Sequence, residues 1–146
     1  MELKAALVGC GAMSRAWIRA AARIPGLRIV ALADLDVERA KQRAAEFSLQ
    51  DVVIAKDAHA LLSRGRPDLL FDVVVPSARH AVVRAGLDAG CHVLSEKPMA
   101  ETLADARDLV TRTKAAGRIH AVVQNRTPHN TPARNEEGRN HLRSGL

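Results

Sequence analysis

The sequence predicts an α/β protein with a doubly wound parallel sheet, covered by helices on both faces. Three observations predict this class. Apolar runs of strand length alternate with segments of helical period along residues 5–124. Most of these runs are apolar at consecutive positions, which is typical of strands buried on both faces. Hydrophobic residues make up 47% of the 146 residues but aromatic residues only 2%, so the core must consist of Ala, Val, Leu and Ile.

The first half of the chain alternates three predicted strands with three predicted helices. The strands are Ala5–Gly9, Leu27–Asp34 and Val52–Ala55. The first predicted helix is Met13–Ile24, and Pro25-Gly26 ends it. The second begins after the capping residue Asp36 and runs to about Phe47. The third covers residues 58–64, with Asp57 as its cap and Gly65 as its end.

The second half repeats the alternation. Its predicted strands are Leu69–Val75, His92–Ser95 and Ile119–Gln124. Its predicted helices are residues 79–89, ending at Gly90, and residues 103–116, with a capping box of Thr102 and Asp105 and a terminating Gly117. Six β-α units of this kind predict the Rossmann strand order 3-2-1-4-5-6.

Residues 1–125 form one predicted domain, and the composition changes after them. Residues 126–146 contain few apolar side chains and two prolines, and Thr131-Pro132 is a suitable start for a helix to about Ser144. We expect residues 126–146 to be a linker and the start of a helix leading to a second domain that this sequence lacks.

Composition argues against several classes of function. The net charge of +6 comes from Lys and Arg spread along the chain, and there is no Tyr to build a base-stacking surface, so nucleic acid is not an expected partner. No apolar run has the length of a membrane span, and the start lacks the features of a signal peptide. Cys10 and Cys91 have no close partner in sequence, which favours a reducing, cytoplasmic setting. No metal site is predicted.

The stretch GCGAMS, Gly9 to Ser14, joins a strand to a helix. Gly9 permits a tight turn, Gly11 lets a pyrophosphate approach the backbone, and Ser14 replaces the third glycine of the dinucleotide fingerprint. Asp34 follows about 20 residues later, where an acid accepts from the adenosine ribose 2′-OH and repels a 2′-phosphate. This favours NAD, although NADP stays open because Arg39 is close by. The alternative is a glycine turn and a helix-capping Asp.

Two further stretches follow the fourth and fifth predicted strands. In PSARH, Pro76 to His80, His80 is either near a cofactor or an exposed helix residue. In SEKPMA, Ser95 to Ala100, a Lys97–Pro98 bond in the cis form would aim Lys97 into the cleft, with Glu96 orienting it. The alternative for SEKPMA is a charged turn. Asp72 is expected to be either buried with a partner or near a strand end.

The succession VGCGAMS, ALADLDVERA, the long stretch from FDVVVPSARH to EKPMAETLADARDLV, and AVVQNR resembles the glucose–fructose oxidoreductase, inositol dehydrogenase and MocA-like family. The resemblance covers about Lys4 to Arg126. It implies an NAD(P)-dependent oxidoreductase acting on a sugar, cyclitol or related polyol, with Lys97 beside the nicotinamide and substrate as the catalytic residue. The cofactor-lining residues that it implies are Gly9, Gly11, Ala12, Met13, Asp34, Pro76, His80, Glu96, Lys97 and Gln124.

The resemblance also limits what this chain is expected to do. Family members are more than twice as long, and their second domain supplies the substrate pocket, the usual acid–base His and most contacts of a homo-oligomer. The segment after Asn125-Arg126 departs from the family pattern. We therefore expect the chain alone to bind dinucleotide without turnover, and a free-standing binding module remains the alternative to part of a dehydrogenase.

Overall fold

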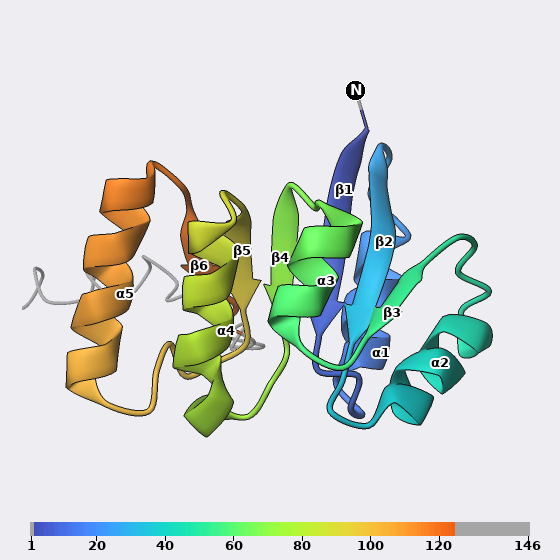
Figure 1. Cartoon of the computed structure of the whole chain (residues 1–146), viewed down its shortest axis with the longest axis horizontal. Helices are drawn as coiled ribbons and strands as arrows, with labels where there is room; N and C mark the ends of the chain where they lie inside the picture. The colour runs from blue at the N-terminus through green and yellow to red at the C-terminus, as the bar shows by residue number, and fades with distance from the viewer. Residues whose placement is uncertain (1, 125–146) are drawn as a thin grey trace, which may run out of the picture.

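The structure is a computed structural model that describes residues 2–124. Six parallel strands form one sheet in the predicted order β3-β2-β1-β4-β5-β6 (Figure 1). The strands are β1 (Leu3–Val8), β2 (Leu27–Ala33), β3 (Val53–Ala55), β4 (Leu69–Asp72), β5 (His92–Ser95) and β6 (His120–Val122). The helices are α1 (Ser14–Ala21), α2 (Val37–Glu46), α3 (Ala58–Gly65), α4 (Pro76–Asp88) and α5 (Leu103–Ala116). The predicted linker and helix at 126–146 lie outside the described residues.

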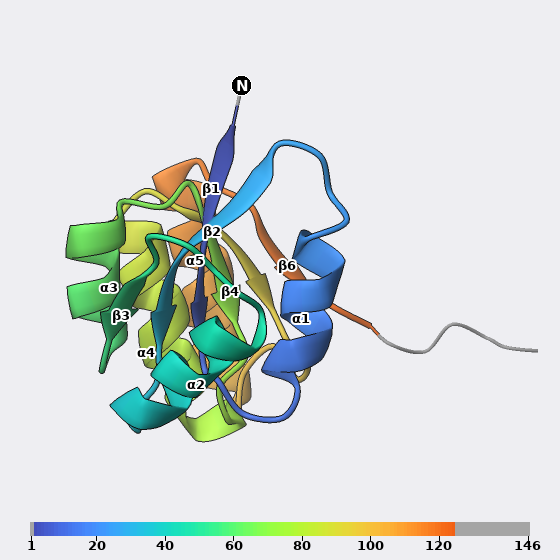
Figure 2. The same ribbon diagram turned by 90° about the vertical axis from the view of Figure 1, so that its right-hand side faces the viewer.

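Helices cover the two faces of the sheet unequally. Helices α3, α4 and α5 pack on one face, and α1 lies on the other (Figure 2). Small buried side chains such as Ala6, Ala31 and Ala33 let these layers approach closely. The core on the α1 side includes Trp17, Phe71 and Leu32 and also draws on α2.

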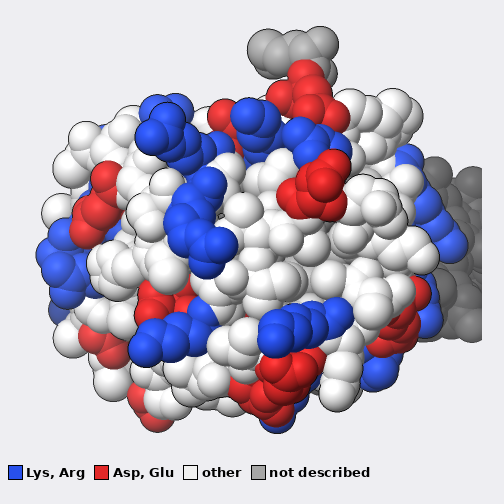
Figure 3. All heavy atoms as spheres, turned by 45° about the vertical axis from the view of Figure 1, so that its right-hand side comes forward, with Lys and Arg blue, Asp and Glu red and all other residues white. Residues whose placement is uncertain are grey.

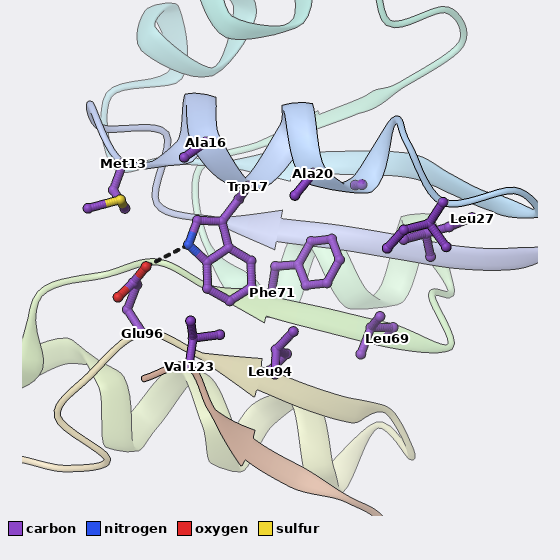
Figure 4. A pocket seen from close by; sticks show the side chains of 12 residues that line it. Met13, Ala16, Trp17, Ala20, Leu27, Leu69, Phe71, Leu94, Glu96 and Val123 are labelled. Atoms are coloured by element: carbon purple, nitrogen blue, oxygen red, sulfur yellow. Dashed lines mark hydrogen bonds between the residues drawn. The ribbon is translucent and has the colours of Figure 1, made fainter. Parts of the chain in front are cut away.

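The face of β4, β5 and β6 that turns toward α1 carries an apolar groove. It has a volume of about 390 Å³ and is lined by Trp17 of α1, by Leu69 and Phe71 of β4, and by Leu94 and Val123 (Figure 4). Trp17 packs against Phe71 with ring centroids 5.2 Å apart. Glu96 is the one charged side chain among the groove's described lining residues.

The predicted helix caps are confirmed. Asp36 accepts a hydrogen bond from the N–H of Arg39, and Asp57 accepts one from the N–H of Ala60. Thr102 Oγ1 accepts from the N–H of Asp105, which is one half of the capping box, and its hydroxyl donates to the Asp105 carboxylate. Gly117 ends α5 in the left-handed conformation.

Several predicted boundaries differ from the structure; for example, the helix predicted to Ile24 ends at Ala21, and the strand predicted to Gln124 ends at Val122. The strand predicted through Val75 ends at Asp72, whose Oδ1 accepts from the N–H of Val74 and turns the chain; α4 then begins at Pro76. The left-handed residue after α3 is Arg66, with φ of 43°, and the preceding Gly65 is the last residue of that helix. Gly65 packs against the sheet instead, where a Cβ would lie 2.9 Å from Ala31 Cβ.

Charged side chains of both signs are interspersed on one face of the molecule (Figure 3). On the face in Figure 3, Lys and Arg side chains lie among Asp and Glu side chains, with apolar and neutral atoms between them. No helix within residues 2–124 has the length and apolarity needed to cross a membrane.

Candidate functional site

A cavity of about 400 Å³ opens at the carboxyl ends of the central strands, in the region where the strand order reverses between β1 and β4. Ligands of doubly wound folds bind at such a point. The cavity brings together Gly9 and Gly11 of the glycine loop and Asp34 at the end of β2. Its other polar or charged lining residues are Asp36, Arg39, Lys56 and Asp57.

The two glycines of the loop do different work. Gly9 has φ of +97°, and a Cβ there would lie 2.5 Å from the carbonyl oxygen of Val73, so backbone geometry excludes any side chain. A Cβ at Gly11 would meet no atom within 4 Å. The space beside Gly11 is therefore open to a ligand. Ser14 is buried and donates to the carbonyl of Gly11 at 2.5 Å, so the small side chain keeps the packing that the third glycine would allow.

Asp34 is less free than the sequence predicts. Its Oδ2 accepts from the N–H of Cys10 at 2.8 Å, and its Oδ1 accepts from the N–H of Asp36 at 2.9 Å. The side chain therefore ties the glycine loop to the end of β2. A carboxylate has about four lone-pair sites, so Asp34 can still accept from a ribose hydroxyl.

Two cations that line the cavity were not among the predicted site residues. Arg39 Nη1 lies 3.5 Å from Asp34 Oδ1, and its side chain is half exposed. Lys56 directly follows β3. The signal for Lys56 was present in the sequence, because it follows an apolar strand as Asp34 and Glu96 do. No role is predicted for this lysine from the sequence.

The SEKPMA turn follows β5, and the predicted cis bond between Lys97 and Pro98 is present. The sequence predicts that Glu96 orients Lys97, but Glu96 makes no hydrogen bond or ion pair with that side chain. Its Oε1 accepts from the indole N–H of Trp17 at 2.8 Å (Figure 4), which links the turn to α1. The Lys97 side chain is exposed and makes no hydrogen bond or ion pair with the described residues. Its role beside a nicotinamide stays a prediction.

Asp72 is both buried and at a strand end. Its Oδ2 accepts from Arg79 Nε at 2.8 Å, with the two side chains 0% and 1% exposed. Arg79 also donates to the carbonyl oxygens of Pro98, at 2.5 Å, and Val74, at 2.7 Å. Burial raises the pKa of Asp72, while Arg79 and Ser95 oppose this shift. Arg79 therefore joins the β4–α4 loop to the turn that carries Lys97.

The other predicted site residues are distributed along the same edge. Ala12 and Met13 are exposed just before α1, Pro76 is the first residue of α4, and Gln124 is exposed just after β6. Met13 and Glu96 line the apolar groove rather than the cavity beside Asp34. His80 points toward α5, with Nε2 at 2.7 Å from Asp108 Oδ2.

Neither cysteine is placed to act as a nucleophile. Both thiols are buried and unpaired. Burial raises the pKa of Cys10 to about 12, with Asp34 adding to the shift. Burial also raises the pKa of Cys91. Within residues 2–124, no three His, Cys, Asp or Glu side chains group as metal ligands would.

Comparisons with known proteins agree with the fold. D-apiose dehydrogenase of Paraburkholderia graminis is 36% identical over 116 residues, which is 80% of this chain and 30% of that protein. Inositol 2-dehydrogenase/D-chiro-inositol 3-dehydrogenase of Lacticaseibacillus casei is 34% identical over 77% of this chain and 32% of its own length. The structure of myo-inositol dehydrogenase from Lactobacillus casei in complex with NAD(H) and myo-inositol superposes with a TM-score of 0.78 at 31% identity, covering 84% of this chain and 36% of that one.

The chain thus spans about a third of the length of these relatives. A sequence profile described as an oxidoreductase family with an NAD-binding Rossmann fold matches residues 3–124. Because that match covers nearly all of the described residues, this chain belongs to the glucose–fructose oxidoreductase, inositol dehydrogenase and MocA-like family and comprises its NAD-binding Rossmann domain.

Proposed function

We propose that the chain is the cofactor-binding part of an oxidoreductase that transfers hydride between NAD and a sugar, cyclitol or related polyol. The observation that carries the proposal is the cavity in which the open side of Gly11 lies beside Asp34 at the carboxyl edge. Two relatives of this chain are dehydrogenases of D-apiose and of inositols, which supports the substrate class.

The residues present fit a dinucleotide. The open space beside Gly11 suits a pyrophosphate near the N-terminus of α1, where backbone N–H groups and the helix dipole favour negative charge. Asp34 would accept from the adenosine ribose and would disfavour a 2′-phosphate, so NAD is the proposed cofactor. The bound nicotinamide would supply the hydride acceptor or donor.

Lys97 is the proposed catalytic residue of the longer protein. Its ammonium would hold or donate a proton at the substrate oxygen bonded to the carbon that gains or loses hydride, as a general acid–base group does. Two hydrogen bonds support the proposal that this turn has a defined shape: the indole N–H of Trp17 donates to Glu96, and Arg79 donates to the carbonyl oxygen of Pro98. Substrate binding is assigned to the longer protein.

Titration with NADH and NADPH tests the cofactor assignment. Trp17 is the only tryptophan and there is no tyrosine, so the protein emission comes chiefly from one residue. Calorimetry checks the affinities, because reduced nicotinamide absorbs light in the range where tryptophan emits. NADH should bind about tenfold or more tightly than NADPH. Asp34→Asn, which keeps one acceptor oxygen, should narrow the difference. Equal affinity of the unmodified chain for both dinucleotides would contradict the assignment to Asp34.

Gly11→Val tests the position of the pyrophosphate. The added side chain would enter open space, so the variant should unfold at nearly the temperature of the parent chain. It should lose measurable NADH binding, because the side chain would occupy ligand space. If Gly11→Val bound NADH as the parent chain does, the glycine loop would be only a structural turn.

For the 146 residues alone we propose dinucleotide binding without turnover. The assay is reduction of NAD in the presence of inositol or glucose, followed by absorbance. Steady reduction by the purified chain would show that residues 1–146 contain a complete active site.

A further inference from the structure

We propose that Arg43 is a positioning residue for the binding of pyrophosphate. Its side chain holds the glycine loop so that two backbone N–H groups of the loop, those of Gly11 and Ala12, point at the ligand. This inference rests on the proposed dinucleotide binding. Arg43 belongs to α2 and is 5% exposed. Its Nη2 donates to the carbonyl oxygens of Cys10 at 3.0 Å and Gly11 at 3.2 Å. Its Nη1 pairs with Glu46 of the same helix.

These two contacts, together with the N–H and Oγ of Ser14 that also donate to the carbonyl of Gly11, determine where the neighbouring N–H groups point. In a trans peptide, the C=O and the N–H of one planar unit point in opposite directions. The carbonyl of Cys10 shares its plane with the N–H of Gly11, and the carbonyl of Gly11 shares its plane with the N–H of Ala12. Because Arg43 draws both carbonyls toward α2, both N–H groups point away from α2.

The hydrogen bonds around the loop agree with this orientation. Among residues 2–124, no acceptor takes the N–H of Gly11 or of Ala12. The preceding N–H, that of Cys10, is taken by Asp34. Two adjacent donors therefore remain for a ligand beside Gly11, where a Cβ would meet open space. Successive backbone N–H groups of this kind form an anion-binding concavity.

The energetics of Arg43 favour a functional explanation. Its Nε is buried and has no hydrogen-bond partner within the described part of the chain. A buried donor without an acceptor lowers stability, and such groups call for an explanation beyond packing. The role of Arg43 in positioning the glycine loop would explain why this residue is present although its Nε has no partner among residues 2–124. The guanidinium also places a positive charge behind the two peptide units that would face the pyrophosphate.

The test compares ligands with and without phosphates in Arg43→Leu, followed by Trp17 emission and calorimetry. NADH and ADP-ribose should bind about 10- to 100-fold more weakly than to the parent chain, as expected when charge-assisted bonds that orient the donors are lost. Adenosine should change by less than about threefold, because Asp34 remains in place. Arg43→Lys should recover part of the loss. Arg28→Leu removes an equal charge from an exposed pair with Glu2 and is the matched control.

A second readout is independent of affinity. In the parent chain, saturating ADP-ribose should change the NMR chemical shifts of the backbone amide protons most at Gly11 and Ala12. These changes should be smaller in Arg43→Leu. Unchanged ADP-ribose affinity in a folded variant would overturn the proposal. An equal loss of adenosine binding would also overturn it, since that would indicate general disruption. If Arg43→Leu does not fold, Arg43→Gln is judged by the same criteria. Failure of the parent chain to bind NADH would instead refute the proposed function.

Discussion

The glycine loop (residues 9–13) and the SEKPMA turn (residues 95–100) lie at the same edge of the sheet, and one arginine binds backbone carbonyls in each region. Arg79 reaches Pro98 and Val74, and Arg43 reaches Cys10 and Gly11. The carboxylate partners differ. Asp72 is 0% exposed, whereas the side chain of Glu46 is 36% exposed.

The difference in exposure between Asp72 and Glu46 indicates that Arg79 acts chiefly on stability and Arg43 chiefly on binding. Removing Arg79 would leave a carboxylate buried without its partner, whereas removing Arg43 would leave Glu46 in contact with water. All three nitrogen positions of Arg79 have acceptors, but Nε of Arg43 has none among the described residues. Arg79 is therefore the structural clamp of the two. The predictions below test this contrast from the largest expected effect to the smallest.

Arg79→Leu should give the largest loss of stability. Breaking a buried ion pair by removing one partner typically costs about 3–5 kcal/mol, because the other charge stays buried. Urea unfolding followed by Trp17 emission measures the free energy of unfolding. The double variant Asp72→Asn/Arg79→Leu should recover much of the loss. A cost below about 1 kcal/mol for the single variant would show that the pair is not a clamp.

Gly9→Ala should be the most damaging single change in the glycine loop. The φ of +97° disfavours a side chain, and the new Cβ would lie 2.5 Å from the carbonyl oxygen of Val73. We expect a loss of about 2 kcal/mol or more in the free energy of unfolding, together with lost NADH binding. Gly11→Ala is the matched control, because its Cβ has open space. Equal stability of the two variants would contradict the distinct roles of the glycines.

Glu96→Gln should test the link between the SEKPMA turn and α1 at a smaller cost. The amide can still accept from the Trp17 indole N–H but lacks the charge, so we expect a loss of about 0.5–1.5 kcal/mol. Glu96→Leu removes the acceptor altogether and should cost more. Either change should shift the Trp17 emission maximum. An unchanged emission spectrum in both variants would show that the hydrogen bond is not maintained in solution.

The pH dependence should show the smallest effect, with opposite signs for the two carboxylates. A hydrogen bond from Arg15 chiefly lowers the pKa of Glu46, with a further contribution from Arg43. Its contribution to stability is present above its unfolded-state pKa and is lost as the pH falls through the folded-state value. Burial raises the pKa of Asp72, so its contribution declines as the pH rises from the unfolded-state pKa through the raised folded-state value.

NMR chemical shifts of the carboxyl carbons of Glu46 and Asp72, measured from low to neutral pH, would follow the titration of both groups directly. Glu46 should titrate below the usual range for glutamate, and Asp72 above the usual range for aspartate. Between the unfolded-state pKa and the raised folded-state pKa of Asp72, the free energy of unfolding of Asp72→Asn should rise more steeply with pH than that of the parent chain. Titration of both groups at their ordinary pKa values would contradict the contrast between the Arg79–Asp72 pair and the Arg43–Glu46 pair.

Local sequence signals determined most of the fold. Alternating apolar runs predicted six parallel strands in the observed order, and side-chain caps at Asp36, Asp57 and Thr102 marked three helix starts correctly. These features depend on residues close together in the chain, so a single sequence displays them. The spacing of the glycine loop and Asp34 likewise brought Gly9, Gly11 and Asp34 to one cavity.

The tertiary structure alone decided which partners the site residues have. Glu96 meets Trp17 across 79 residues of sequence, and Arg43 reaches the glycine loop across 32 and 33. No local pattern encodes these contacts, because they arise where helices pack beside the sheet. Asp72 shows the same limit: its sequence left two alternatives open, and only the approach of Arg79 from α4 explains how a carboxylate is buried at the end of β4.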